Sequence, residues 1–311
     1  MQLIRGTSSL RESHRGCVVT IGTFDGIHVG HQALIRRAAQ RARELGRGAM
    51  LLTFEPTPRE YLAPDAAPAR LTTLRERCRV LARLASAGAR LDAMCVLRFD
   101  EKLRKLSGGE FATLLARDLR ASEVVVGHDF RFGHGAAGSA QALREAGPGL
   151  GFQVEVIDPI VLGGERVSSS GVREALASGN FARARGWLGR PYSMLGRVVA
   201  GERLGRRLGF PTANIRPGRK RMALGGVFAV RVQGAGLDGR PGVASLGTRP
   251  TVNGVEPLLE AHVFDFEGDL YGRELEVEFV AKLRDEQRFG SLDALVEQMH
   301  RDAGNARRAL E

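Results

Sequence analysis

Cysteine is scarce in this sequence, and its three cysteines do not form a ligand set. Cys17, Cys78 and Cys95 include no CxxC pair, and each lies in or beside an apolar stretch. This pattern excludes a disulfide framework and argues against a zinc site, because neither the number nor the spacing of ligands fits. Free, buried thiols in a reducing compartment are the expected state.

Long apolar runs are also missing. No run approaches the roughly 18 residues that a membrane-spanning helix requires. The segment from Met1 to Arg15 is polar and has no signal-peptide core. We therefore expect a cytoplasmic protein that does not bind membranes.

Lysine is rare, although the chain is strongly basic. Lysine and arginine number 46 against 35 acidic residues, which gives a formal net charge of +11. The basic residues are scattered, and aromatic residues make up only 6%, so the pattern does not favour a nucleic-acid surface. We expect an arginine-rich, solvated surface and no nucleic-acid partner; a steep salt dependence of DNA or RNA binding would revive that alternative. The only lysines are Lys102, Lys105, Lys220 and Lys282.

What the first half does contain is an alternation of short apolar runs and helical patterns. Such alternation predicts a doubly wound parallel sheet, in which strands buried on both faces are almost continuously apolar. We place this α/β domain at residues 1–188 and the linker at Gly189-Arg-Pro191. Strands are predicted at 17–21, 49–54, 92–97, 123–126 and 152–157, and helices at 32–44, 71–87, 107–119, 140–146, 169–177 and 181–188.

The second half, residues 189–311, has a different pattern. Short β-like segments are separated by clusters of Gly, Pro and Asn, which predicts an antiparallel sheet or a small barrel. Residues 291–310 have helical spacing and are expected to pack on its outside. The predicted strands are 195–199, 227–232, 242–245, 258–266 and 275–283.

The first chemical site is predicted where strand 17–21 ends, in Gly22-Thr-Phe-Asp-Gly-Ile-His-Val-Gly-His31. Ligands of parallel sheets bind at the carboxyl ends of strands, where helix N-termini favour phosphate. His28 and His31 share one face of a helical turn and can donate hydrogen bonds to a triphosphate. The alternatives are ordinary polar residues at a helix start, or a zinc site, for which no third ligand lies close by.

Three later segments narrow the interpretation: Phe54-Glu-Pro-Thr-Pro58, Val125-Val-Gly-His-Asp-Phe-Arg-Phe-Gly133 and Val167-Ser-Ser-Ser-Gly-Val-Arg173. With the segment at 22–31, they resemble the HxGH nucleotidyltransferases, and in particular the FMN adenylyltransferase module of bacterial bifunctional riboflavin kinase/FAD synthetases. Members of this superfamily attack the α-phosphate of ATP and release pyrophosphate.

The resemblance implies that His28 and His31 contact the ATP phosphates. Capping of a helix is the alternative role for Ser168 and Ser169, and the role of His128 stays open. No general base is needed, because the FMN phosphate is already an anion. The residues expected to line the ATP and flavin sites are Gly22, Phe24, Asp25, Gly30, Asp129, Ser168, Ser169 and Arg173.

A second chemical site is predicted in the glycine-rich stretch from Gly196 to Asn214. Its glycines let the backbone wrap phosphates closely, and Thr212 and Asn214 offer hard oxygen ligands for Mg²⁺. A glycine-rich surface turn is the alternative. The residues expected to bind ATP or flavin here are Gly201, Gly205, Arg206, Gly209 and Pro211.

Downstream, Leu259-Glu-Ala-His-Val-Phe-Asp-Phe266 alternates as a strand, and Glu260 could take a proton from a hydroxyl. A solvent-facing strand glutamate is the alternative. Together with Pro211-Thr-Ala-Asn214, Leu270-Tyr-Gly272 and the segment 279–289, this strand resembles the riboflavin kinase module of the same bifunctional family. The resemblance implies a six-stranded barrel, MgATP at Thr212 and Asn214, and Glu260 as the base that activates the riboflavin 5′-hydroxyl.

The two motif sets imply consecutive steps of one pathway. We expect riboflavin to be phosphorylated to FMN and FMN to be adenylylated to FAD, with ATP as co-substrate and Mg²⁺ at both steps. The competing hypothesis is another HxGH adenylyl- or cytidylyltransferase joined to an unrelated β domain, and the segment 211–214 argues against it.

Overall fold

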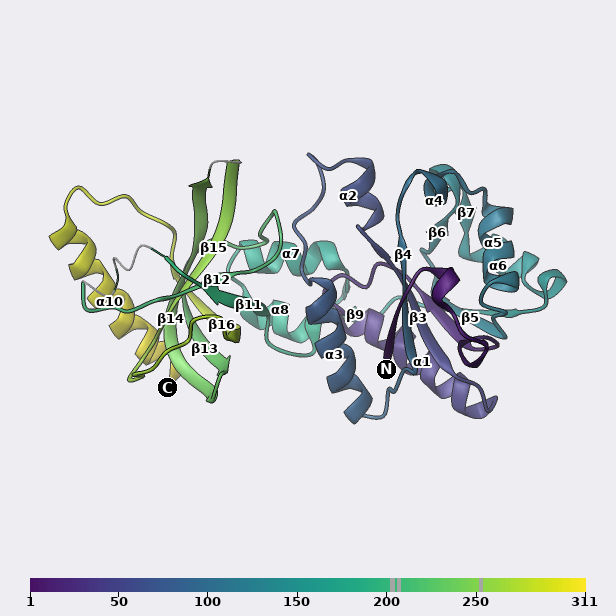
Figure 1. The fold of residues 1–311 in the computed structure, drawn as a ribbon, viewed down its shortest axis with the longest axis horizontal. Helices are drawn as coiled ribbons and strands as arrows, with labels where there is room; N and C mark the ends of the chain where they lie inside the picture. The colour runs from purple at the N-terminus through teal and green to yellow at the C-terminus, as the bar shows by residue number, and fades with distance from the viewer. Residues whose placement is uncertain (202–204, 206–207, 252–253) are drawn as a thin grey trace. The chain divides into compact units, whose positions relative to one another are not determined.

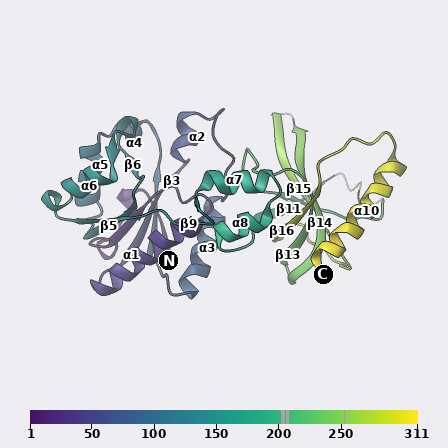
Figure 2. The same ribbon diagram turned by 180° about the vertical axis from the view of Figure 1, so that it is seen from behind.

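The computed structural model describes residues 1–201, 205, 208–251 and 254–311, and the side chains of 249–256 are outside that description. The chain forms two compact units (Figures 1 and 2). The first combines Met1–Pro68 with Arg77–Ser168, and the second combines Ala69–Glu76 with Ser169–Glu311. The expected functional boundary between residues 188 and 189 stays a prediction, because a division into compact units does not show which residues perform which reaction.

The first unit is built on a six-stranded sheet in the order β1-β4-β3-β2-β5-β8, and all its neighbouring strands are parallel. The predicted α/β fold is therefore confirmed. Strand β1 was not predicted, because only Ile4 of its four residues is buried and an exposed edge strand lacks a continuous apolar run. The strands are β1 Gln2–Arg5, β2 Val18–Ile21, β3 Ala49–Glu55, β4 Ala93–Arg98, β5 Glu123–Gly127 and β8 Gln153–Ile157.

Helices cover both faces of this sheet. Val19 and Ile21 of β2 belong to one core cluster with Phe111 and Leu115 of a following helix, whereas helix α1 contacts β2, β3 and β5 without joining that cluster. The helix predicted from residue 107 begins with a capping box, in which Glu110 accepts a hydrogen bond from Ser107 N at 2.8 Å. The helices are α1 Val29–Glu44, α2 Pro58–Leu62, α3 Leu74–Ser86, α4 Glu101–Lys105, α5 Gly108–Arg117 and α6 Ala140–Ala146. Short strand pairs β6–β7 (Arg131–Phe132, Gly138–Ser139) and β9–β10 (Val161–Leu162, Glu165–Arg166) complete the unit.

The second unit contains a closed six-stranded antiparallel barrel in the order β11-β12-β15-β14-β13-β16. Helix α10 packs on the barrel wall, where Ala306 and Leu310 meet Ala229 and Phe264. The barrel and its terminal helix confirm the second half of the predicted fold. The elements are α7 Ser169–Ala177, α8 Phe181–Leu188, β11 Ser193–Val199, β12 Ala213–Arg216, β13 Gly226–Gly234, β14 Leu237–Thr251, β15 Gly254–Val263, β16 Glu274–Arg284 and α10 Leu292–Leu310.

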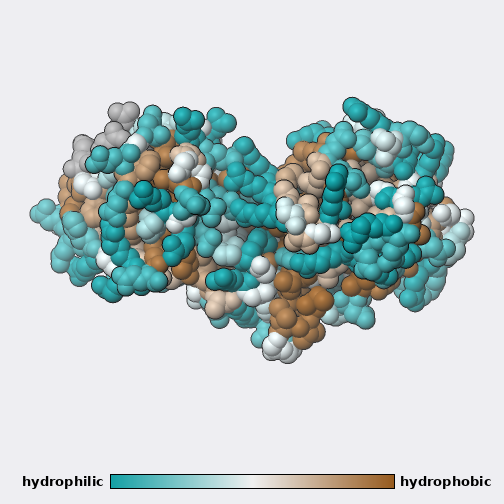
Figure 3. Space-filling view, turned by 90° about the horizontal axis from the view of Figure 1, so that it is seen from below, coloured by the Kyte–Doolittle hydropathy of each residue, from teal (hydrophilic) through white to brown (hydrophobic). Residues whose placement is uncertain are grey.

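The face drawn in Figure 3 is largely polar: hydrophilic residues are spread over it, and smaller apolar patches lie among them. Across the described ranges, no helix combines the length and the apolar character needed to cross a membrane.

Candidate functional sites

The His28–His31 loop occupies the switch point of the parallel sheet. From β2 the strand order runs through β3, β4 and β1 on one side and through β5 and β8 on the other. Ligands of open α/β sheets bind at the carboxyl ends of strands where the order reverses. The loop 22–28 leaves β2 at that end and leads directly into α1.

The two imidazoles lie against each other at the first turn of α1. Their rings are stacked, with centroids 3.7 Å apart and planes 16° from parallel. His28 is the N-cap: its Nδ1 accepts a hydrogen bond from the backbone N–H of His31 at 3.3 Å. A neutral ring that accepts at Nδ1 carries its proton on Nε2, so in this form Nε2–H is the donor group of the His28 ring.

His31 is held in its neutral form. Burial lowers the pKa of His31 well below its ordinary value of 6.5, and the neighbouring His28 and Arg77 lower it further. Nδ1 of His31 is buried and has no hydrogen-bond partner among the described residues. A neutral imidazole with an unused nitrogen is suited to hydrogen bonding with a phosphate oxygen.

The backbone of the loop is unusual. Phe24 and Ile27 have φ values of 49° and 41°, and both side chains are fully buried. Asp25 is 7% exposed and lies between them. A Cβ on Gly22 would come within 3.3 Å of the Phe24 ring, and one on Gly30 within 3.2 Å of the His28 imidazole. Glycine at positions 22 and 30 therefore leaves room for the rings of Phe24 and His28 to pack closely against the backbone of the loop.

The other predicted residues of the first site fall on both sides of the division between the units. Asp129 follows β5, which pairs with β2, and it forms an exposed ion pair with Arg166. Ser168 ends the first unit, whereas Ser169 begins α7 and Arg173 lies on that helix in the second unit. Nε of Arg173 donates to the carbonyl of Ala69 at 2.5 Å, within the second unit. His128 is exposed.

One residue of this region was missed from the sequence. Arg77 is 1% exposed and donates to the carbonyl of Thr23 and to Oγ1 of Thr53, both at 2.9 Å. It lies on the buried face of α3, at the helical spacing of Val80, Leu81 and Leu84, which are all buried. A charged residue within an apolar helical stripe was the available signal.

The predicted magnesium ligands of the second site face the glycine-rich segment. A Cβ on Gly201 would lie 2.8 Å from Cγ of Asn214, and one on Gly205 would lie 3.3 Å from Oγ1 of Thr212. Gly201 is therefore required by the close approach of its backbone to the Asn214 side chain, whereas at Gly205 the nearest obstacle to a Cβ is the backbone carbonyl of Phe210. Gly209 has a φ of +84° and closes a turn in which Phe210 N donates to the Gly205 carbonyl at 2.8 Å. Arg206 lies outside the described residues.

Glu260 and Asn214 are direct partners across the barrel wall. Strands β12 and β15 pair Asn214 with Glu260, and β14 places Ser245 on the other side of Glu260. Side chains of directly paired residues share one face of a sheet. His262 and Phe264 follow Glu260 on this face, and Phe264 packs against α10. The face that carries the carboxylate is thus the one covered in part by the terminal helix.

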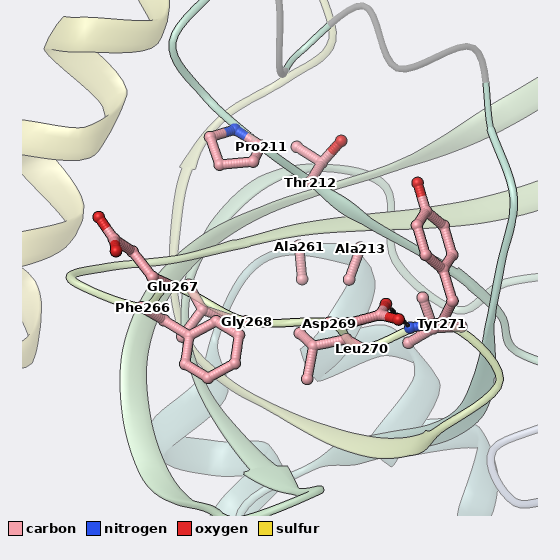
Figure 4. Close-up of a pocket in the computed structure, with 12 residues that line it drawn as sticks. Pro211, Thr212, Ala213, Ala261, Phe266, Glu267, Gly268, Asp269, Leu270 and Tyr271 are labelled. Atoms are coloured by element: carbon pink, nitrogen blue, oxygen red, sulfur yellow. Dashed lines mark hydrogen bonds between the residues drawn. The ribbon is translucent and has the colours of Figure 1, made fainter.

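A cavity of about 290 Å³ opens on the neighbouring positions of the same strands (Figure 4). Ala213 and Ala261 form its floor, and Pro211 and Thr212 lie along one edge. The loop that follows β15 closes it with Phe266, Glu267, Gly268, Asp269, Leu270 and Tyr271. Thr212 therefore borders both the glycine-rich segment and the cavity.

The zinc alternative gains no support. Within the part of the chain that the structure describes, no group of three or more His, Cys, Asp and Glu side chains could hold a metal ion. All three cysteines are free thiols, and burial raises the pKa of Cys17 to about 12 and that of Cys95 to about 11.

A parallel-sheet unit with paired imidazoles at its switch point and a barrel unit with a glycine-rich polar site define a two-module transferase of the nucleotide-dependent class. Comparisons with known proteins specify the family. Residues 10–171 match the model of FAD synthetase, and residues 188–310 match that of riboflavin kinase. The chain belongs to the bifunctional riboflavin kinase/FMN adenylyltransferase family.

Relatives of this family align along nearly the whole chain. A bifunctional riboflavin kinase/FMN adenylyltransferase of Pseudomonas fluorescens is 46% identical over 99% of this chain and 97% of its own length. That of Escherichia coli strain K12 is 45% identical, with the same coverage of both chains. A solved structure titled as a macrolide-efflux protein from Streptococcus pneumoniae covers 99% of both chains, with 30% identity and a TM-score of 0.83.

Proposed function

We propose that the chain phosphorylates riboflavin to FMN in the barrel unit and adenylylates FMN to FAD in the sheet unit, with ATP as co-substrate of both reactions. One observation carries the proposal: a single chain holds the stacked His28–His31 pair and the Asn214–Glu260 pair, each inside the family match for its own reaction. The relatives' names give the same two activities over the full length.

In the adenylylation step, an oxygen of the FMN phosphate attacks the α-phosphorus of ATP, and pyrophosphate leaves. The nucleophile is an anion, so the residues need only orient the two substrates and stabilise the charge that develops. Nε2–H of His28 and the neutral ring of His31 are the proposed donors to the phosphate oxygens. The positive end of the α1 dipole adds to this stabilisation.

In the phosphorylation step, the nucleophile is the riboflavin 5′-hydroxyl and a base is required. Glu260 is the proposed base: its carboxylate takes the hydroxyl proton as the oxygen attacks the γ-phosphorus of ATP and ADP leaves. Asn214 lies directly beside Glu260 and faces the Gly201 backbone. This arrangement supports a γ-phosphate position between the glycine-rich segment and the carboxylate.

The barrel site suits Mg²⁺. Asn214 is 8% exposed and Thr212 half-buried, and both offer hard, uncharged oxygens toward the same glycine-rich segment. Magnesium in phosphoryl-transfer sites binds to a few protein oxygens together with substrate phosphates and waters. Thr212 and Asn214 would hold the ion, which when bound neutralises charge on the ATP phosphates. Its involvement at the adenylylation step rests on the family resemblance.

The cavity beside Thr212 is the proposed place for the rest of the nucleotide. Its floor of small apolar side chains and its rim of backbone and polar groups match the composition of small-ligand pockets. We also propose a cytoplasmic location, which the free thiols favour.

Glu260→Gln tests the kinase assignment. The amide keeps the size of the side chain but cannot take the proton, so FMN formation should fall by a factor of about 100 or more. FMN-to-FAD conversion, measured with FMN supplied, should stay within twofold of the unaltered chain. Glu297→Gln, which changes an exposed glutamate on α10 outside the cavity lining, is the matched control. A kinase rate unchanged by Glu260→Gln would remove Glu260 from the role of base.

A further inference from the structure

Arg77 is a buried charge that neither proposed reaction uses directly. Its side chain is fully enclosed, and taking a guanidinium out of water is costly unless its donors are satisfied. Its guanidinium donates to three groups of the first unit: Thr23 O and Thr53 Oγ1 at 2.9 Å, and a carboxylate oxygen of Glu55 at 2.6 Å. All three partners join α3 to the loop that carries the imidazoles or to β3, the strand beside β2.

The contact with Thr23 fixes the start of that loop. The Thr23 carbonyl accepts a second hydrogen bond from Oγ1 of Thr53 at 3.3 Å. The next residue is Phe24, with its φ of 49°, and Ile27 follows with a φ of 41°. Non-glycine residues keep such conformations only where the surroundings hold them. The guanidinium of Arg77, which donates to the Thr23 carbonyl, is a charged group among those surroundings.

Arg77 also affects the charge state of His31. Its positive charge adds to burial and to His28 in lowering the pKa of His31. Glu55, the partly buried last residue of β3, is the carboxylate paired with Arg77, and Asp25 is a buried acidic residue of the loop itself. The guanidinium therefore acts on the geometry of the loop and on the protonation of one of its imidazoles.

We propose that Arg77 is a positioning residue for adenylyl transfer, which holds the loop 22–28 so that His28 and His31 stay stacked in reach of the ATP phosphates. The proposal rests on the proposed FMN adenylylation. Arg77 itself contacts neither substrate, so its loss should lower the turnover number more than it raises the KM for FMN.

The test uses Arg77→Met and Arg77→Lys in the full chain, with Arg79→Met as the control because Arg79 is exposed on the same helix. FMN-to-FAD turnover should fall about 10- to 100-fold in Arg77→Met, the range expected for a misplaced catalytic group. Riboflavin-to-FMN turnover should stay within twofold, and Arg77→Lys should recover part of the loss. Turnover by Arg77→Met within twofold of the unaltered chain, or an equal loss in Arg79→Met, overturns the proposal.

An NMR titration of the His31 imidazole provides a readout that does not depend on turnover. The pKa of His31 should rise in Arg77→Met, because a repelling positive charge is removed, and should not change in Arg79→Met. An unchanged His31 pKa and ring environment overturn the proposal even if the chain proves inactive with FMN, which would contradict the proposed function separately. If Arg77→Met does not fold, the same two measurements on Arg77→Lys decide.

Discussion

At the residue scale, His28 has one observed role and one proposed role, and removal of its side chain would abolish both at once. It caps α1 through Nδ1, and it is proposed to donate through Nε2 to a phosphate. Loss of a side-chain cap costs about 1 kcal/mol, whereas loss of a transition-state donor costs about 10²–10³ in rate. The two contributions can be separated because asparagine caps helices well but does not place a donor where the imidazole does.

We therefore predict that His28→Ala and His28→Asn both lose FAD formation by a factor of about 100 or more, while FMN formation is unchanged. Only His28→Ala should also lower the stability of the first unit, by about 1 kcal/mol. Rates with FMN or riboflavin as substrate, and thermal unfolding, measure the two effects. Near-normal FAD formation by His28→Asn would mean that the residue is only a cap.

At the element scale, the backbone of the glycine-rich segment before β12 lies close to the side chain of Asn214 on that strand. Gly201 has no room for a side chain, because a Cβ there would meet the Asn214 amide. Gly201→Ala must therefore displace either the segment or Asn214, and we expect FMN formation to fall about 10- to 100-fold. FAD formation from supplied FMN should be unchanged.

Gly186→Ala is the matched control for this substitution. Gly186 lies in α8 with open space at the Cβ position, so alanine should stabilise the helix by roughly 0.5–1 kcal/mol and leave both rates unchanged. A Gly201→Ala chain as active a kinase as the Gly186→Ala chain would contradict the close-approach argument.

Elements with a strong local signal could be predicted from the sequence, and those defined by distant contacts could not. Strand β2 and helix α1 follow from an apolar run, glycines and helical spacing, and the Ser107 cap from its glutamate partner. Strand β12 was missed because it begins after Pro211 and contains the buried polar Asn214, which read as a turn.

The candidate sites show the same division. The HxGH segment and the segment 211–214 are local in the sequence, so their residues could be named from it. Arg77 could not, because its partners Thr23 and Thr53 are brought to it only by the fold. The pairing of Asn214 with Glu260 likewise depends on strand register across the barrel. The roles of these residues stay predictions until variants are measured.

At the scale of the whole molecule, the sheet half of the sequence contributes a segment to the barrel unit. Residues Ala69–Glu76 cluster with Ser169–Glu311. Arg219, whose side chain is fully buried, forms an ion pair with the buried Glu76 and donates to the Leu71 carbonyl at 2.8 Å. Glu76 also accepts from the backbone N–H of Leu195 at 2.8 Å. The buried Arg219–Glu76 ion pair is thus one of the contacts that hold the segment in the second unit.

Removing one partner should leave an uncompensated buried charge. We predict that Arg219→Met destabilises the second unit by about 3–5 kcal/mol, and that the double substitution Arg219→Met with Glu76→Met recovers much of the loss. Denaturant unfolding of the full chain measures both, with the exposed Arg221→Met as control. A loss below about 1 kcal/mol, the size of a surface pair, would contradict this account.

The central claim is that one chain performs two consecutive flavin reactions. The direct test is to incubate the purified protein with riboflavin, ATP and Mg²⁺ and to separate the flavins over time. FMN should appear first and FAD after it, because the FMN formed in the barrel unit is the substrate of the sheet unit. A folded protein that forms no phosphorylated flavin would contradict the account, and one that stops at FMN would contradict the function assigned to the His28–His31 site.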